Sequence, residues 1–491
     1  MYFYQGAPFY HKAKCNILTW AQPVDDFENI KKDRIIMKKT HYTRLAVIML
    51  VCVMAASAFF TACSKQEEEE EIPPPPPSDP LTGALVEDGF DESALTRRTV
   101  AFVVENAPDA RPQWGMDDEN YSPDILLQGE VEGGITRTLW LYSDYKKLPA
   151  VIGPMRSARP PYIKFSEMFD SVFIHWGMSH SKGEYIGANS IFRWHGVDHI
   201  NQMTLDDKEG LYDRDGSRGV SSEHTGIVHT DKLEATMKNE GFRSEPKEFT
   251  KLNFFETAQP VSTDPAKTVS VKYSDRADWE NTDWTYNEED EMYHTSSFEN
   301  DFKRDNLLVL YDDTEYITKS DYQGGGGGSV TYCDYLFSGG KAQLFTKGSV
   351  KELQWQRKAG KLMLIDPAVT MEDIEAKAAE LMEADKKMSE KKAIREAAAA
   401  LGAVIAEVPM TDEELEEAMT AFEKSKEAGE VEEDAEFEPE KYVSQSLNKG
   451  KTWIGWISAN NGGSVKVDAG DLTITMPGSE DAGEGEESAD A

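Results

Sequence analysis

Arginines stand out in this otherwise acidic chain, because they occur in turn-like stretches rich in glycine and proline. They are Arg111, Arg137, Arg156 and Arg159, and Ser157 lies between the last two. A guanidinium group is a planar fork of N–H donors that holds a carboxylate or a phosphate through two hydrogen bonds. If these side chains converge, they form a pocket for a wall or lipid-linked phosphate or for a peptide carboxylate.

The same arginines have an alternative, structural interpretation. Buried arginines in turns commonly pair with carboxylates and thereby hold tight loops together. Glu132, Asp124 and Glu105 are acids available for such pairs. We also count Glu132 among the candidate binding residues. Both interpretations stay open at this point.

The histidines are unevenly distributed, since six of nine fall within 55 residues. Imidazole titrates near neutral pH and ligates metals, so such clustering is relevant to catalysis. The six are His175, His180, His195, His199, His224 and His229. His175 and His224 are the candidates for a general acid or base. The chain has no His-Glu-x-x-His or Cys-x-x-Cys string, so we predict neither a metal site nor a cofactor.

Two other stretches do not match the catalytic or phosphate-binding motifs that they partly resemble. Gly324 to Gly328 form a run that lacks the Lys-Ser/Thr of a phosphate-binding loop, so a flexible hairpin between strands is expected there. Ser179 has no Gly-x-Ser-x-Gly elbow around it, which leaves serine hydrolase chemistry without support.

Composition sets the class of protein. The chain has 491 residues, of which 39% are hydrophobic, enough to fill the cores of roughly two to four domains. A formal net charge of -37 disfavours nucleic acid as a partner. Four cysteines at positions 15, 52, 63 and 333 are too scattered for a disulfide framework.

The N-terminal region predicts where the protein resides. Residues 45–60 are an apolar run, preceded by Lys38, Lys39 and Arg44, that is short for a bilayer span of roughly 20 residues. Cys63 follows in a Phe-Thr-Ala-Cys string that resembles the bacterial lipoprotein signal, in which the cysteine receives acyl chains such as palmitate. The alternative is an uncleaved anchor helix. Either way, the body is expected on the outer face of the cytoplasmic membrane.

The remaining sequence divides by composition. We expect residues 1–62 to be an upstream extension and a signal peptide that starts at Met37, and residues 63–94 to be an acidic, proline-rich stalk. We expect an α+β fold, with a mixed α/β domain over 95–262 and a β-rich domain over 263–368 and 442–476. The N-terminal domain should contain strands near 99–105, 124–131, 136–142 and 171–176, and helices over 158–168 and 179–188. Residues 477–491 are a disordered acidic tail.

An acidic helical insert is predicted over 369–441. Thr370 with Asp373, and Thr411 with Glu414, have the spacing of helix N-terminal capping boxes. Ile394, Ala397, Leu401 and Ile405 lie at helical spacing, which fits either packing onto the β-rich domain or a docking helix. Because strand-like patterns resume after the insert, we expect residues 372–438 to be dispensable for folding.

Several strings together resemble the YerB-like family of bacterial lipoproteins, whose two-domain body has no known function. The strings are Ala110-Arg111-Pro112-Gln113, Glu132-Gly133-Gly134-Ile135-Thr136-Arg137, Gly153-Pro154-Met155-Arg156-Ser157-Ala158-Arg159-Pro160 and Gly450-Lys451-Thr452-Trp453-Ile454. The resemblance covers about 95–365 and 447–470, and it departs from the family pattern at Leu127-Gln128 and at Glu223-His224-Thr225. It implies architecture and location but no reaction.

These observations favour a membrane-anchored, non-catalytic binding or accessory factor of the cell envelope. Its partner would be an anionic wall polymer or a membrane protein, in addition to the membrane held through the lipid. The alternative is an envelope hydrolase or transferase with an active site lined by arginine and histidine. An enzyme requires a histidine or carboxylate within hydrogen-bond reach of the arginines in a cleft, whereas a binder requires only a complementary surface.

Overall fold

The computed structural model describes residues 76–116, 121–277, 281–320, 328–432 and 434–476. Several predicted features lie outside the described residues: the signal peptide, Cys63, the first part of the stalk, most of the glycine run and the acidic tail. Within the described ranges, no helix combines the length and apolar character needed to cross a membrane.

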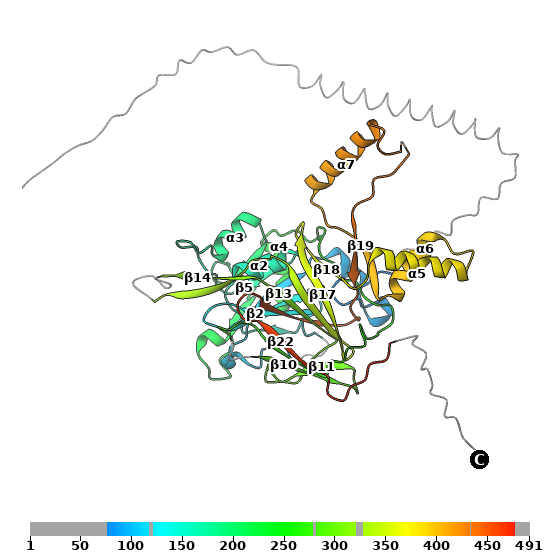
Figure 1. The fold of residues 1–491 in the computed structure, drawn as a ribbon. Helices are drawn as coiled ribbons and strands as arrows, with labels where there is room; N and C mark the ends of the chain where they lie inside the picture. Colours follow the sequence, from blue (N-terminus) through cyan, green and yellow to red (C-terminus); the bar gives the residue numbers. More distant parts are fainter. Residues whose placement is uncertain (1–75, 117–120, 278–280, 321–327, 433, 477–491) are drawn as a thin grey trace, which may run out of the picture. The chain divides into compact units, whose positions relative to one another are not determined.

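A twelve-stranded sheet forms the centre of the described body (Figure 1). In spatial order its strands are β19 (Ala403–Glu407), β20 (Lys441–Gln445), β18 (Lys361–Ile365), β17 (Ser349–Lys358), β16 (Gly340–Thr346), β13 (Asn306–Asp312), β21 (Thr452–Ser458), β2 (Ile125–Glu130), β3 (Thr136–Tyr142), β1 (Val100–Glu105), β5 (Val172–His175) and β6 (His199–Asn201). The strands expected near 99–105, 124–131, 136–142 and 171–176 are therefore present.

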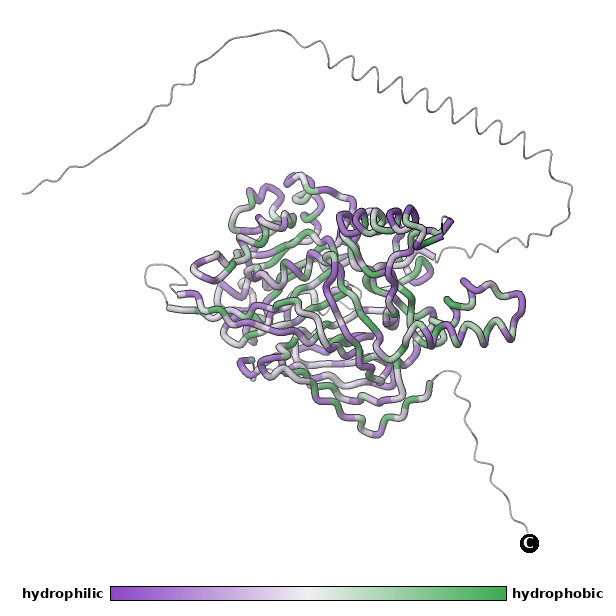
Figure 2. The backbone as a smooth tube through the Cα atoms, turned by 45° about the horizontal axis from the view of Figure 1, so that its top comes forward, coloured by the Kyte–Doolittle hydropathy of each residue, from purple (hydrophilic) through white to green (hydrophobic). Residues whose placement is uncertain are grey.

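Both faces of this sheet are covered, which explains the long apolar runs of its central strands. Helices α2 (Pro160–Glu167) and α3 (Ala188–His195) contribute to one core, with Tyr162, Phe165 and Phe192 buried. A five-stranded sheet of β9 (Thr268–Lys272), β10 (Thr282–Asn287), β11 (Met292–Thr295), β12 (Phe302–Arg304) and β22 (Ser464–Asp468) contributes to the other core. Figure 2 shows hydrophobic stretches running through the inner strands and mostly hydrophilic outer turns.

Smaller elements complete the body. Strands β4 (Val151–Ile152), β8 (Gly226–His229) and β7 (Tyr212–Arg214) form a three-stranded sheet, which α4 (Leu233–Asn239) follows in the chain. Strands β14 (Thr314–Lys319) and β15 (Val330–Tyr335) pair antiparallel on either side of the glycine run.

Two helix predictions in the N-terminal region had different outcomes. The helix expected over 158–168 is confirmed as α2, which begins with two prolines at positions that need no amide donor. The helix expected over 179–188 is wrong, because helix α3 begins only at Ala188. Gly183 has a positive φ of 62°, and the Ser179 hydroxyl accepts the Ala188 N–H at 3.1 Å, so this stretch is a turn that leads into α3.

The insert contains helices α5 (Met371–Ala384), α6 (Glu390–Ala400) and α7 (Asp412–Glu427). Both predicted capping boxes are confirmed, at Thr370 and at Thr411. The helical stripe that was predicted to reach Ile405 is wrong, because α6 ends at Ala400 and Ile405 lies in β19 opposite Val443. Gly402, with a φ of 72°, separates the helix from the strand. The insert therefore adds an edge strand to the main sheet.

The body is an α+β fold, as the sequence predicted, and its C-terminal part is rich in strands. Strand β21 lies between β2 of the N-terminal region and β13 of the C-terminal region, and it is parallel to both. The two regions thus share one sheet. The division of the body into separate domains stays a prediction.

Candidate ligand-binding pocket

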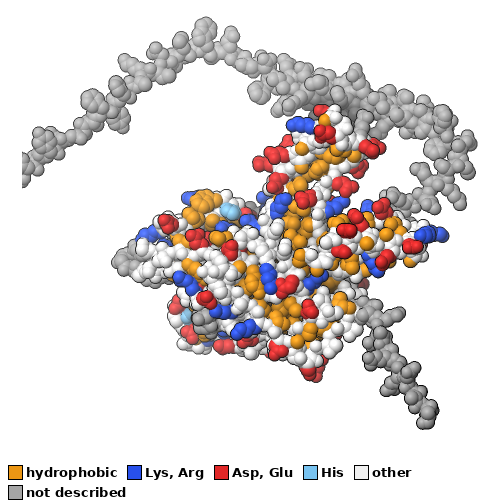
Figure 3. Space-filling model, in the orientation of Figure 1, with side chains coloured by type: hydrophobic (Ala, Val, Ile, Leu, Met, Phe, Trp, Pro, Cys, Tyr) orange, Lys and Arg blue, Asp and Glu red, His pale blue; other side chains and the backbone are white. Residues whose placement is uncertain are grey.

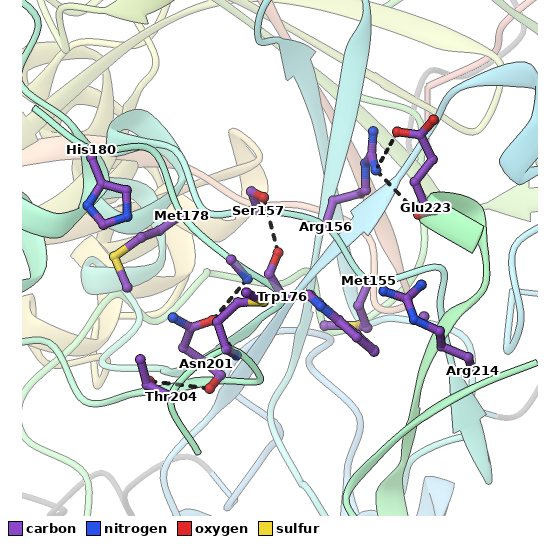
Figure 4. A pocket seen from close by; sticks show the side chains of 13 residues that line it. Met155, Arg156, Ser157, Trp176, Met178, His180, Asn201, Thr204, Arg214 and Glu223 are labelled. Atoms are coloured by element: carbon purple, nitrogen blue, oxygen red, sulfur yellow. Dashed lines mark hydrogen bonds and ion pairs between the residues drawn. The ribbon is translucent and has the colours of Figure 1, made fainter. Parts of the chain in front are cut away.

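A pocket of about 430 Å³ opens where three parallel strands end. Strands β1, β5 and β6 are neighbours and run parallel, and ligands in open α/β sheets typically bind outside the carboxyl ends of such strands. The lining residues are Met155, Arg156, Ser157, Trp176, Gly177, Met178, His180, Asn201, Met203, Thr204, Arg214, Glu223 and Gly226 (Figure 4).

Backbone hydrogen bonds fix the segment that carries Arg156 and Ser157. The Arg156 N–H donates to the Val103 carbonyl at 2.9 Å, and the Arg156 carbonyl accepts from the Trp176 N–H at 3.0 Å. The Ser157 hydroxyl donates to the Trp176 carbonyl at 3.1 Å. Two of the predicted binding residues are thereby held between the ends of β1 and β5, at the mouth of the pocket.

Arg156 interacts with two carboxylates and keeps partial access to solvent. Its Nε lies 3.1 Å from Glu105 Oε1, and one terminal nitrogen lies 3.5 Å from Glu223 Oε2. Glu105 is buried, and its second oxygen lies 2.9 Å from His224 Nδ1. The Arg156 side chain is 24% exposed, so a ligand can reach it. The Glu223 side chain is exposed, and its carboxylate lies near Arg156 at a position that the anionic group of a ligand could take.

Trp176 and Arg214 form a second cationic element of the pocket. The Arg214 guanidinium lies over the Trp176 ring at 4.3 Å from its centre, a favourable cation–π distance. A side chain at Gly226 would approach the same ring to 2.7 Å, so glycine is needed for the tryptophan to pack there. Sequence reasoning missed Arg214, because β7 lies far along the chain from Arg156 and only the fold brings the two to one pocket.

Arg137 and Arg159 do not line the pocket. Both pair with the Glu132 carboxylate and hold a loop in place. Arg137 donates to Glu132 Oε1 at 3.1 Å and to the Ser157 carbonyl at 2.7 Å. Arg159 donates to Glu132 Oε2 at 2.8 Å and also contacts Oε1 of the same carboxylate. Burial opposes ionisation of Glu132, yet the two guanidinium groups lower its pKa to about 2. This buried ion triad ties the loop after β2 to the start of α2.

Arg111 lies outside the pocket as well. Its guanidinium donates to the side chain of Asn106 at 3.3 Å and to the Asn106 carbonyl at 2.6 Å. Burial lowers the pKa of Arg111. Of the four predicted arginines, only Arg156 therefore lines the pocket.

The two candidate catalytic histidines have different surroundings. His175 is completely buried, with Nδ1 2.6 Å from the Gly177 carbonyl and Nε2 2.9 Å from His199 Nδ1. Burial, together with His199, lowers the pKa of His175 to about 3, so this ring is neutral and has no access to a ligand. His224 is 9% exposed, paired with Glu105, and not among the lining residues. Across the described ranges, no group of three or more His, Cys, Asp or Glu side chains could hold a metal ion.

The fold and the pocket define an α+β protein with an arginine-lined pocket at the ends of parallel strands. Residues 81–243 match the family model described as "Protein of unknown function (DUF3048) N-terminal domain". This matched region includes every residue that lines the pocket. The chain is 27% identical over 292 residues to "Putative lipoprotein YerB" of Bacillus subtilis (strain 168), covering 58% of this chain and 79% of that protein. The chain is thus similar to proteins of the YerB-like family, the resemblance that its sequence strings indicated.

A solved structure is also similar. The crystal structure of the YerB protein from Bacillus subtilis has 19% sequence identity and a TM-score of 0.49, and the match covers 79% of this chain and 99% of that one.

Proposed function

We propose that this protein is a lipid-anchored binding factor on the outer face of the cytoplasmic membrane. Its pocket would take an anionic group of an envelope component, either a wall polymer or a membrane protein. The observation that carries the binding role is the presence of two guanidinium groups, Arg156 and Arg214, in the lining of one pocket.

The anchor is supported by the cysteine signal and by the relative's name. The similar Bacillus subtilis protein is described as a lipoprotein, and Cys63 follows a short apolar run with basic residues before it. Cys63→Ser should therefore leave an unprocessed precursor that takes up no labelled fatty acid. Normal acylation of this variant would contradict the anchor proposal.

The binding role can be tested in the full processed chain with substitutions that remove the positive charge of one arginine. Arg156→Gln and Arg214→Gln should each weaken co-sedimentation with anionic envelope fragments, because each removes a donor of charge-assisted hydrogen bonds. Arg395→Gln, on the exposed face of α6, is the matched control and should bind like the wild type. Equal binding by all variants would rule out the pocket as the site.

The contacts of Glu105 support the catalytic alternative. The Glu105 carboxylate lies between Arg156 Nε at 3.1 Å and His224 Nδ1 at 2.9 Å, an arrangement that can orient a histidine for proton transfer. A hydrolase or transferase that uses His224 would lose turnover in His224→Gln and keep ligand binding. We favour binding because His224 is not among the side chains that line the pocket.

A further inference from the structure

Asn201 has a buried side-chain amide whose donor group faces the pocket. The side chain is 4% exposed and lies at the end of β6. Its Oδ1 accepts the N–H of Gly177 at 2.9 Å and the N–H of Met203 at 3.2 Å. Because two donors point at one atom, that atom must be the oxygen, and the NH₂ group is the other. Within the described residues this NH₂ group donates no hydrogen bond.

The NH₂ nitrogen is not among the fully enclosed polar atoms that lack a partner, so it is accessible from the pocket, and its donors can bind an oxygen acceptor of a ligand. The same pocket has two chemically different sides. In Figure 4, Arg156, Arg214 and Glu223 lie to one side of Trp176, whereas Asn201, Met178 and His180 lie to the other. The cationic side suits a negative group, and the Asn201 side suits a neutral acceptor.

Apolar side chains supply much of the remaining wall. Met155, Trp176, Met178 and Met203 all line the pocket, and Met203 is 66% exposed. Flexible thioethers adapt to apolar groups of different shapes. A phosphorylated sugar would place its hydroxyl groups against this wall, whereas an aliphatic or aromatic side chain would bury apolar area there.

From these features we infer that the pocket binds the carboxyl terminus of a polypeptide that ends in an apolar residue. The terminal carboxylate takes the cationic side and competes with Glu223 for Arg156. A backbone carbonyl near the terminus accepts the Asn201 NH₂ group, and the last side chain packs on the methionines. Carboxylate capture of this kind is a recurring mode of peptide recognition. The inference rests on the proposed anion-binding function and specifies its ligand.

The first test uses calorimetry on the full processed chain with an N-acetylated tetrapeptide that ends in leucine. The free carboxylate form should bind, and the same peptide as a C-terminal carboxamide should bind at least about tenfold more weakly, since it lacks the charge that Arg156 and Arg214 hold. Equal affinity for the two forms would overturn the inference. Inorganic phosphate and glucose 1-phosphate serve as competing ligand classes, and tighter binding of either would overturn it as well.

The second test changes a few atoms only. Asn201→Asp keeps Oδ1 for the Gly177 and Met203 N–H groups and replaces the pocket-facing donor by an acceptor, so peptide affinity should fall about tenfold or more. Asn287→Asp is the matched control, because Asn287 Oδ1 accepts the Glu289 N–H at 2.9 Å in a hairpin outside the pocket. Unchanged peptide affinity in a folded Asn201→Asp variant would contradict the inference.

A third variant keeps the inference testable if the Asn201→Asp variant does not fold. The exposed Met203→Ser should weaken binding of the leucine-terminated peptide more than binding of a glycine-terminated one. An equal effect on both peptides would argue against the apolar wall. If envelope fragments still bind in an Arg156-dependent manner while no peptide binds, the inference fails and the proposed function stands. If Arg156→Gln changes neither kind of binding, both fail.

Discussion

Arg156 and Arg159 are three positions apart, but their surroundings give them different roles. The Arg156 side chain is 24% exposed and reaches the pocket, whereas the Arg159 side chain is 9% exposed and is bound to Glu132. Charge at a partly exposed site is available to a ligand. Charge at a buried site is already used to neutralise another buried charge, and its removal affects stability instead.

Glu132→Gln should therefore destabilise the fold strongly. The change leaves two buried guanidinium groups, Arg137 and Arg159, without their shared carboxylate, a loss of about 3–5 kcal/mol by comparison with other broken buried pairs. Urea unfolding measures this difference. Glu223→Gln removes an exposed carboxylate from Arg156 and should change the free energy of unfolding by less than about 1 kcal/mol. Similar losses in both variants would show that Glu132 is not a buried structural centre.

The residue types of the pocket could be predicted only in part. The arginine-rich strings marked Arg156 and Ser157, because a guanidinium between rigid turns is visible in sequence. Asn201 and Arg214 could not be predicted, since they reach the pocket through parallel pairing of β5 with β6 and through the β7–β8 hairpin. The sequence also could not separate Arg156 from Arg137 and Arg159, because burial depends on what packs above each side chain.

Asp124 is expected to make stability depend on pH. Burial, and then the charge of Asp79, raise the pKa of Asp124 to about 6 from an ordinary value of 3.8. A carboxyl group with a raised pKa in the folded state stabilises the fold below about pH 4, and this contribution is lost as pH rises through 6. Asp124→Asn should thus gain stability over the wild type at pH 8, on the order of 2 kcal/mol, and little at pH 4.

This difference between variant and wild type is the informative measurement, because other groups act in the opposite direction. Burial lowers the pKa of His175 to about 3 and that of His199 to about 4, so both destabilise the fold as pH falls below their ordinary value of 6.5. Thermal unfolding of both proteins from pH 4 to pH 8 separates the contributions. A constant difference across this range would contradict the assignment to Asp124.

At the scale of elements, local and non-local signals had different predictive value. The capping boxes at Thr370 and Thr411 were predictable because each is closed by a carboxylate three residues later. Strand β19 was not predictable, since an apolar stretch after an alanine-rich helix resembles its continuation. Pairing with β20 decides that this stretch is extended.

The insert should divide into a dispensable and an essential part. Helix α7 has no buried residue, and Figure 3 shows acidic side chains along it together with hydrophobic ones. The chain on either side of it meets where the Val408 N–H donates to the Glu440 carbonyl at 2.7 Å. Replacing residues 410–438 by a short Gly/Ser turn should therefore keep the β19–β20 hairpin and leave the melting temperature within about 2 °C of the wild type.

Replacing 372–438 instead is the comparison, and it revises the expectation that this whole stretch is dispensable. That deletion removes β19 and α6, uncovers Val443 and leaves β20 as an exposed edge strand that pairs with β18 through one residue pair, Ile365 with Ser444. We expect a lower melting temperature and aggregation. If the two deletions melt alike, β19 does not contribute to the sheet.

For the described body as a whole, the central feature is that chain-distant regions share one sheet and the cores on both of its faces. Strand β21 comes near the end of the described chain, yet it lies between β2 and β13. Composition indicated that strands resume after the insert, but the position of β21 between the two regions depends on long-range pairing that no local pattern encodes. A shared sheet of this kind predicts that both regions unfold together.

Trp456 on β21 provides the test of this cooperativity. Its ring is fully buried and stacks on the ring of Tyr335 in β15, with 4.0 Å between the ring centres. The ring centre of Phe165 in α2 lies 5.5 Å away, so Trp456 joins both regions. Trp456→Ala should cost about 3–5 kcal/mol through the cavity that it creates. Hydrogen exchange should then accelerate equally in β1 and in β16, because both belong to the sheet that opens. Trp194→Ala, at a position that is 58% exposed, should leave exchange unchanged. Faster exchange in β16 alone would show that the two regions unfold as separate domains.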